Sequence, residues 1–207
     1  MIYAWHFVPQ NLKLAHSGEP VEVGRTYRVE GKIVPCKNGL HGSVRLIDAL
    51  TYSSSSVLTR CAYGGEIVHE SDKLAASERT ILWLGDIDQI LHEAACVFAE
   101  GALRVVKVTD PRSWAAIDAK RKWLRGEITE KELDAAVNVA WTAAWDAATS
   151  AATGAATSAA SIAAWAAARV ARDAARSAAR AAASIAAWAA ENDWLECAVR
   201  EFTGVDQ

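Results

Sequence analysis

The chain has 207 residues, which is enough for one large domain or two small ones, each with its own hydrophobic core. Its formal net charge of -3 gives no overall attraction to nucleic acids or to membrane surfaces. The four cysteines are scattered without a C-x-x-C pair, as is typical of reduced thiols in a cytoplasm. The N-terminus lacks the basic and apolar regions of a signal peptide, and the apolar runs are too rich in alanine to predict a membrane span. We therefore expect a cytoplasmic protein with no membrane partner.

The first part of the chain has the pattern of a β-rich fold. Through residues 1–9 the aromatic residues Tyr3, Trp5 and Phe7 alternate with Ile2, Ala4, His6 and Val8, which is the two-residue period of a strand. Further short strands are predicted at residues 21–23, 26–30, 32–34 and 80–84. Two strand-like runs flank Gly64-Gly65, so a β-hairpin with its turn at these glycines is predicted over residues 57–69. Ser43 is predicted to cap the short helix that follows it.

Every signal after Gly85 is helical. Helix start signals stand at Asp86, at Asp110 with its following proline, and at the Thr129–Glu132 capping box. The abrupt change from strand period to helix period predicts an α+β protein. We expect a small β-rich N-terminal domain at residues 1–85 and an all-α, alanine-rich helical bundle at residues 86–207.

An alanine-rich run at residues 135–190 dominates the second half. Alanine has the highest helix propensity, and its pairs recur here every four residues. Because a helix turns by about 100° per residue, such a repeat would drift around one straight helix. Several helices packed closely through small side chains, with a break near Gly154, fit the pattern better. The same packing would allow two copies of the chain to form a homodimer.

A line of arginines within this run is the first candidate site. Arg169, Arg172, Arg176 and Arg180 follow one another in steps of three and four residues, which places them on one side of a continuous helix. Trp165 lies one turn before Arg169, at a spacing that suits a cation–π contact. These five residues are a candidate docking surface for an acidic protein or a nucleic-acid backbone. The alternative is a solvated face that keeps an alanine-rich helix in solution.

The second candidate site lies in the β-rich half. His41 and Ser43 precede the predicted short helix, whose free backbone N–H groups are suited to hold an anion. Lys73 and Arg79 would add phosphate contacts, so the set predicts a pocket for a nucleotide or NAD. In the alternative interpretation, His41 and Ser43 stabilise a turn, while Asp72, Lys73 and Arg79 form structural ion pairs.

Metal binding and nucleophilic catalysis have less support. Cys36, His41, Cys61 and His69 supply ligands that suit zinc, but their spacing is loose and no C-x-x-C pair is present, so no metal site is predicted. The chain has no G-x-S-x-G motif and no phosphate-binding glycine loop. The sequence therefore favours a binding protein over an enzyme, and no cofactor is expected.

Several spaced elements of the first half occur in order over residues 1–85. They are Cys36-x-x-Gly39-Leu40-His41-x-Ser43, Asp48-Ala49-Leu50-x-Tyr52, Gly65-x-Ile67, Asp72-Lys73 and Arg79. In this pattern the chain resembles an uncharacterised domain family that is associated with phages and prophages. Because that family has no established activity, the resemblance implies only the setting of a phage or prophage gene.

The helical half carries a second set of spaced residues. They are Asp110-Pro111-Arg112, Ala116-Ile117, Leu124-x-Gly126-x-Ile128-Thr129 and Leu133, followed by the alanine repeats. In these the chain is similar to alanine-rich bacterial proteins described as immunity proteins, which implies a bacterial cytoplasm as the setting. We expect a non-enzymatic interaction protein that docks on a host protein or a protein–nucleic-acid complex and inhibits a defence system such as a CRISPR-type complex. The alternative is a nucleotide- or NAD-binding protein that uses the pocket around His41.

Overall fold

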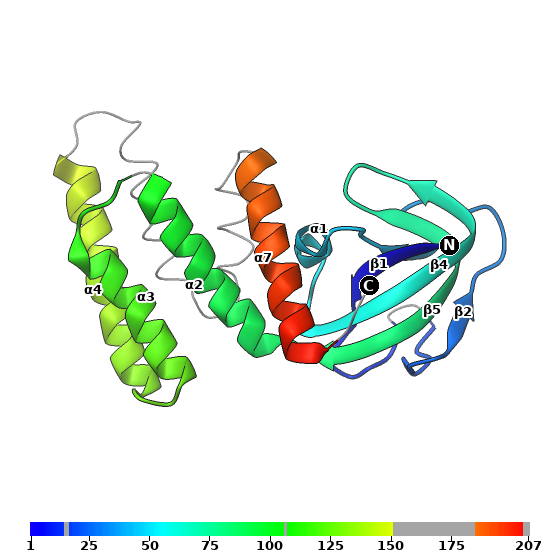
Figure 1. Cartoon of the computed structure of the whole chain (residues 1–207), viewed down its shortest axis with the longest axis horizontal. Helices are drawn as coiled ribbons and strands as arrows, with labels where there is room; N and C mark the ends of the chain where they lie inside the picture. The colour runs from blue at the N-terminus through cyan, green and yellow to red at the C-terminus, as the bar shows by residue number, and fades with distance from the viewer. Residues whose placement is uncertain (15–16, 106, 151–184, 205–207) are drawn as a thin grey trace. The chain divides into compact units, whose positions relative to one another are not determined.

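The computed structural model describes residues 1–14, 17–105, 107–150 and 185–204 (Figure 1). The chain divides into two compact units, of which Met1–Asp88 with Ala189–Gln207 form the first and Gln89–Trp188 the second. All described strands lie within residues 2–86 and the long helices follow them, so the predicted α+β class is confirmed. The predicted domain boundary near residue 85 stays a prediction, and the division adds a return of the chain to the first unit at Ala189.

The first unit is built on an antiparallel sheet with the order β1-β4-β5-β2, and β3 also pairs with β5. Its strands are β1 (Ile2–Phe7), β2 (Thr26–Arg28), β3 (Leu40–Gly42), β4 (Val57–His69) and β5 (Leu74–Asp86). The strand predicted at residues 1–9 forms as β1, and the one predicted at 26–30 forms as β2. Residues 21–23 and 32–34 lie outside the strands of the described chain. Figure 1 shows β4 and β5 as two long strands side by side.

The predicted hairpin turn at Gly64-Gly65 is wrong, because β4 continues through both glycines. The register between β4 and β5 shifts between Gly64, which pairs with Glu78, and Ile67, so Gly65 and Glu66 form a bulge within the strand. Gly65 has φ +70°, and a Cβ at this position would collide with the Oγ of Ser77 on β5. A glycine pair between two strand-like runs can therefore mark a bulge within one strand as well as a turn between two strands.

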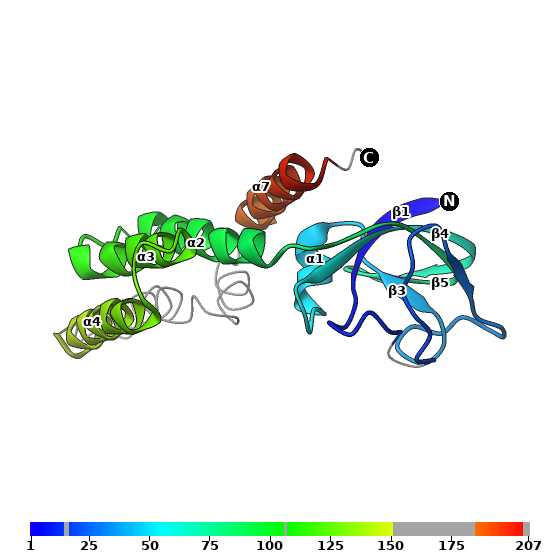
Figure 2. The same cartoon turned by 90° about the horizontal axis from the view of Figure 1, so that it is seen from below.

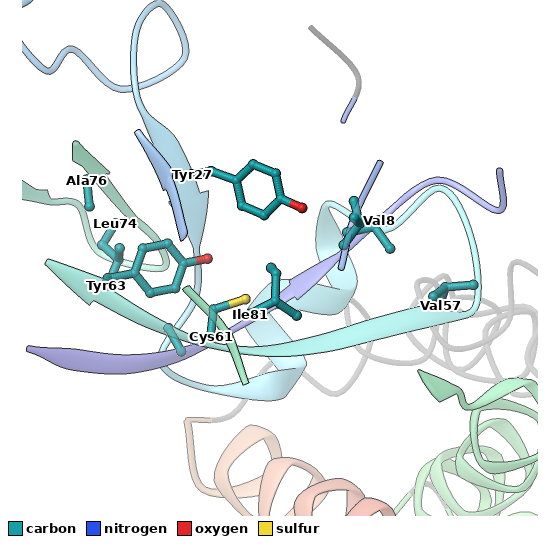
Figure 3. Close-up of a cluster of buried hydrophobic side chains, with 10 residues drawn as sticks. Val8, Tyr27, Val57, Cys61, Tyr63, Leu74, Ala76 and Ile81 are labelled. Carbon is teal, nitrogen blue, oxygen red and sulfur yellow. The ribbon is translucent and has the colours of Figure 1, made fainter. Parts of the chain in front are cut away.

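An apolar cluster on one face of the sheet forms the core of the first unit (Figure 3). Its buried members are Ala4, Val8, Val21, Tyr27, Val57, Cys61, Tyr63, Leu74, Ala76 and Ile81. Most come from alternate positions of β1, β4 and β5, as expected for strands with one buried face. Each fully buried large aliphatic side chain contributes about 1.5–3 kcal/mol relative to an exposed one.

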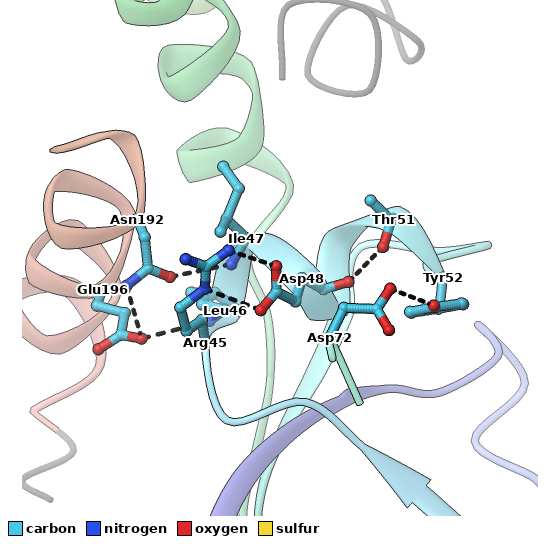
Figure 4. A network of polar contacts seen from close by, with 9 residues as sticks. All are labelled: Arg45, Leu46, Ile47, Asp48, Thr51, Tyr52, Asp72, Asn192 and Glu196. Atoms are coloured by element: carbon cyan, nitrogen blue, oxygen red, sulfur yellow. Dashed lines mark hydrogen bonds and ion pairs between the residues drawn. The ribbon is translucent and has the colours of Figure 1, made fainter. Parts of the chain in front are cut away.

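Helix α1 (Leu46–Thr51) is capped by the C-terminal helix α7 (Ile185–Thr203) and not by Ser43, so that prediction is wrong. The backbone N–H of Ile47 donates to Asn192 Oδ1 at 3.1 Å, and the N–H of Leu46 donates to Glu196 Oε1 at 3.3 Å (Figure 4). Ser43 instead exchanges two backbone hydrogen bonds with Trp5 of β1. The first N–H groups of a helix have no acceptor within the helix, and two of those in α1 find their acceptors on α7. The C-terminal helix is therefore part of the first unit.

The second unit is helical, with α2 (Asp88–Val105), α3 (Pro111–Leu124) and α4 (Glu130–Ser150). The predicted caps are confirmed, since Asp110 accepts from the N–H of Arg112, and Thr129 and Glu132 bond each other's N–H groups reciprocally. Helices α3 and α4 pack against each other (Figure 2). None of the described helices combines the length and the apolar character that crossing a bilayer requires.

Candidate ligand-binding cavity

A cavity of about 630 Å³ in the first unit brings together all four residues of the predicted nucleotide pocket. His41 comes from β3, Ser43 directly follows that strand, Lys73 precedes β5, and Arg79 lies on β5. The four residues are separated by up to 38 positions in the sequence and meet because β3 and β5 pair antiparallel. A cavity of this size is in the range of sites for small molecules.

The most unusual residue of the cavity is Arg79, whose side chain is only 2% exposed. Its Nη1 donates to the backbone oxygen of His41 at 3.2 Å, while its Nε is buried and has no hydrogen-bond partner in the described part of the chain. Among the described residues no carboxylate forms an ion pair with this guanidinium. A buried charge without an opposite charge costs several kcal/mol, which makes Arg79 a candidate anchor for an anion.

His6 of β1 lines the same cavity and remains uncharged near neutral pH. Burial holds the pKa of His6 well below its ordinary value, and the positive charge of Arg79 lowers it further, with a smaller contribution from His41. A neutral imidazole carries one N–H donor and one acceptor nitrogen. His6 therefore provides the cavity with a neutral hydrogen-bonding group beside the permanent charge of Arg79.

His41 is held in place from both its side chain and its backbone. The N–H of Cys36 donates to His41 Nε2 at 2.9 Å, so this ring nitrogen acts as the hydrogen-bond acceptor. The backbone oxygen of His41 accepts from Tyr63 Oη at 2.6 Å as well as from Arg79. Tyr63 reaches this oxygen only because the next residue is Gly42, where a Cβ would collide with the phenol group.

The rim of the cavity is also positively charged. Lys73 Nζ lies 3.3 Å from Cys36 Sγ, 3.3 Å from a carboxylate oxygen of Glu70, and 4.8 Å from the ring centre of Tyr52. Its hydrogen bond to Cys36 raises the pKa of Lys73 above the ordinary value, so the ammonium group stays charged. The lining contains four basic residues against a single acidic one, Glu19, and that carboxylate already pairs with Arg25. The four basic residues are Arg28, Lys37, Lys73 and Arg79.

Two details of the sequence interpretation are wrong. The N–H groups at the start of α1 are occupied by Asn192 and Glu196 and are not available to an anion. The alternative in which Asp72, Lys73 and Arg79 form a set of ion pairs also fails. Asp72 accepts from the hydroxyl of Tyr52 at 2.5 Å, Lys73 pairs with Glu70, and Arg79 has no ion pair within the described chain.

His6 and Tyr52 line the cavity and Tyr63 supports it through His41, and sequence reasoning assigned none of the three to the site. His6 stands in the alternating pattern of β1, where it occupies the same face as the buried Ala4 and Val8. A histidine at an inward-facing position is the signal that would have found it. Tyr52 and Tyr63 carry no such signal, because aromatic residues are common on strands and short helices.

The other sequence-predicted sites have different outcomes. The proposed docking surface of Arg169, Arg172, Arg176, Arg180 and Trp165 lies outside the described residues, so docking on a host complex stays a prediction, as does the homodimer. Of the zinc candidates, Cys36 and His41 come together through a backbone hydrogen bond. Within the described part of the chain, no group of three or more histidine, cysteine or acidic residues is arranged to hold a metal ion.

The fold and the cavity define an α+β protein with a ligand-sized pocket in a β-rich unit. Residues 2–93 match a family model described as a domain of unknown function, DUF7666. The matched segment contains every strand of the sheet and every residue that lines the cavity. Neither the curated proteins nor the solved structures gave a match to the chain.

Proposed function

We propose that the first unit binds a small anionic ligand in its cavity, with Arg79 as the principal anchor. The observation that carries this proposal is the guanidinium of Arg79, which is buried at the cavity wall without an ion pair among the described residues. A bound phosphate or carboxylate group would supply the missing opposite charge and would accept a hydrogen bond from the unpartnered Nε. Binding would therefore offset the free-energy cost of burying the charge of Arg79 without an opposite charge.

The size and lining of the cavity favour a ligand of the nucleotide class. A volume of about 630 Å³ suits a molecule with a base, a sugar and one or two phosphates. Trp5, Phe7, Tyr27 and Tyr52 add aromatic and apolar surface to the wall, which suits the flat face of a base. The positive rim at Lys73 would attract the ligand from solution. All four cysteines are free, so we place this binding role in a reducing compartment such as the cytoplasm.

A thermal-shift series with inorganic phosphate, AMP and NAD tests the proposal. At least one of these anions should raise the melting temperature of the wild-type chain, because a ligand stabilises the state that it binds. Arg79→Gln should remove the shift, since a hydrogen bond to a charged group contributes about 1.5–3 kcal/mol. Arg104→Gln, an exposed arginine of α2, is the matched control and should retain the shift. Equal shifts in wild type and Arg79→Gln would reject Arg79 as the anchor.

A further inference from the structure

The two exposed cysteines of this chain have opposite electrostatic surroundings. Cys36 Sγ lies 3.3 Å from the ammonium nitrogen of Lys73, whereas Cys197 Sγ lies 3.6 Å from a carboxylate oxygen of Glu201. The carboxylate of Glu201 raises the pKa of Cys197 above its ordinary value. A cation next to a sulfur atom stabilises negative charge there, and a carboxylate opposes it. Both thiols are therefore exposed, and they differ in the sign of the charge next to the sulfur atom.

The other two cysteines are shielded from reagents. Cys61 and Cys96 are both fully buried, and burial raises the pKa of each thiol, to about 12 for Cys96. Buried thiols in their neutral form react slowly with disulfides because the thiolate is the nucleophile. Cys36 and Cys197 are thus the pair in which an effect of local charge on thiol chemistry can be measured.

The position of Cys36 is fixed by its surroundings. Its φ of +63° is unusual for a residue with a side chain, and its N–H is bonded to His41 Nε2. Lys73 is held from a second side by the carboxylate of Glu70 at 3.3 Å and by the ring of Tyr52. The sulfur and the ammonium group are therefore held against each other by contacts from three different segments of the chain.

Cys36 also lines the cavity that contains Arg79. Under the proposed function, the buried guanidinium of Arg79, whose Nε has no partner among the described residues, would attract anionic groups into this cavity. A molecule that carries both a carboxylate and a reactive sulfur would be drawn toward the thiol by the same field that holds its charge. Cys36 thus combines an accessible thiol, an adjacent cation and an unpaired buried cation. Within the described residues Cys197 lacks the unpaired buried cation, since the nearby Arg200 pairs with Glu196.

We propose that Cys36 is a thiol–disulfide exchange site that reacts preferentially with anionic low-molecular-weight disulfides. The proposal rests on the proposed function for the contribution of Arg79, while Lys73 acts directly beside the reacting sulfur. The product is a mixed disulfide at the mouth of the cavity. Small thiols with carboxylate groups are the chemical class of partner that this site would accept.

The exchange reaction is balanced without any further oxidant. The thiolate of Cys36 attacks one sulfur of the small disulfide, a new S–S bond forms, and the old S–S bond breaks. The other half leaves as a thiolate and takes up the proton that the Cys36 thiol released. One disulfide is consumed and one is formed, so no electrons enter or leave the reacting pair.

The test compares two aliphatic disulfides of opposite charge on the full chain. Dithiodipropionate carries carboxylates and cystamine carries ammonium groups, and the rates of mixed-disulfide formation at Cys36 and at Cys197 are followed by peptide mass analysis. The anionic-to-cationic rate ratio should be at least about tenfold higher at Cys36 than at Cys197. Comparing ratios removes the intrinsic difference in reactivity between the two reagents. Added salt should reduce the ratio at Cys36, because screening weakens exposed charges.

Two variants locate the source of the preference. Lys73→Gln and Arg79→Gln should each lower the ratio at Cys36 and leave the ratio at Cys197 unchanged. Two results on the wild-type chain alone would overturn the proposal. They are equal rate ratios at the two cysteines and a ratio at Cys36 that does not change with salt concentration. If phosphate and AMP bind but the ratios are equal, only the thiol proposal fails. If the ratio is high but no anion binds, the proposed function fails and the exchange site stands.

Discussion

The first unit contains two clusters of buried polar groups, and they differ in whether each group has a partner. At the contact of α1 with α7, Asp48 receives two hydrogen bonds from Arg45, and Asn192 accepts from the N–H of Ile47 (Figure 4). At the cavity, Arg79 is equally buried but keeps a free Nε and has no ion pair in the described chain. A closed network, in which every buried polar group has a partner, stabilises the fold. An open network, in which a buried group lacks a partner, can still form a hydrogen bond to a ligand.

Removing the charge of Arg79 should stabilise the empty protein, which is the largest effect we expect. Arg79→Met keeps most of the side-chain volume, and the backbone oxygen of His41 keeps its bond from Tyr63. Replacing buried charge by apolar groups of similar volume often stabilises a protein, and we expect a gain of about 1–3 kcal/mol in the free energy of unfolding. Urea unfolding of the ligand-free chain measures it. A loss of similar size would show that Arg79 is a structural residue like Asp48.

The closed network should respond in the opposite direction. Asn192→Ala leaves the buried N–H of Ile47 without an acceptor, which should lower the free energy of unfolding by about 1–2 kcal/mol. Asn138→Ala, on the exposed face of α4, is the control and should change stability by less than about 0.5 kcal/mol. If both variants unfold at the same urea concentration, α7 does not cap α1 in solution.

Glu191 of α7 provides a smaller, pH-dependent test of the same distinction. One of its carboxylate oxygens is buried and has no partner among the residues that the structure describes, and burial raises the pKa of Glu191 from 4.5 to about 7. Between these values the folded chain holds a proton that the unfolded chain releases, so stability should fall as the pH rises from 4.5 through about 7. Glu191→Gln should flatten this part of the stability profile, whereas Glu201→Gln, at an exposed position, should leave the slope unchanged. A wild-type slope in Glu191→Gln would contradict the assignment.

Local sequence signals predicted the long helices of the described residues well and the sheet only in part. The caps at Asp110 and Thr129 act within one helical turn, so a short window of sequence contains all the information they need. The glycine bulge of β4 depends on Ser77 of β5, and the cap of α1 depends on Asn192. These partners are distant in sequence, and no local pattern distinguishes a bulge from a turn or a borrowed cap from an absent one.

The cavity residues could be grouped from the sequence because their types suit anion binding. Their individual roles could not be predicted in this way. Lys73 and Arg79 read alike as phosphate contacts, yet the structure places Lys73 at the rim with Glu70 and Arg79 at a buried wall with no ion pair in the described residues. Burial and pairing are properties of the folded chain, so only the structure separates the two cations. The place of His6 in the site is likewise a property of the folded chain, because it depends on the pairing of β1 with β4.

Calorimetric titration of the wild-type chain and of Arg79→Gln with AMP and with adenosine tests the central claim most directly. The two ligands differ by the phosphate group, and the two proteins differ by the charge proposed to receive it. We predict that wild type binds AMP at least about tenfold more tightly than adenosine, and that Arg79→Gln binds both with similar, weak affinity. Equal preference for AMP in the two proteins, or binding of neither phosphate, AMP nor NAD by the wild type, would contradict the account.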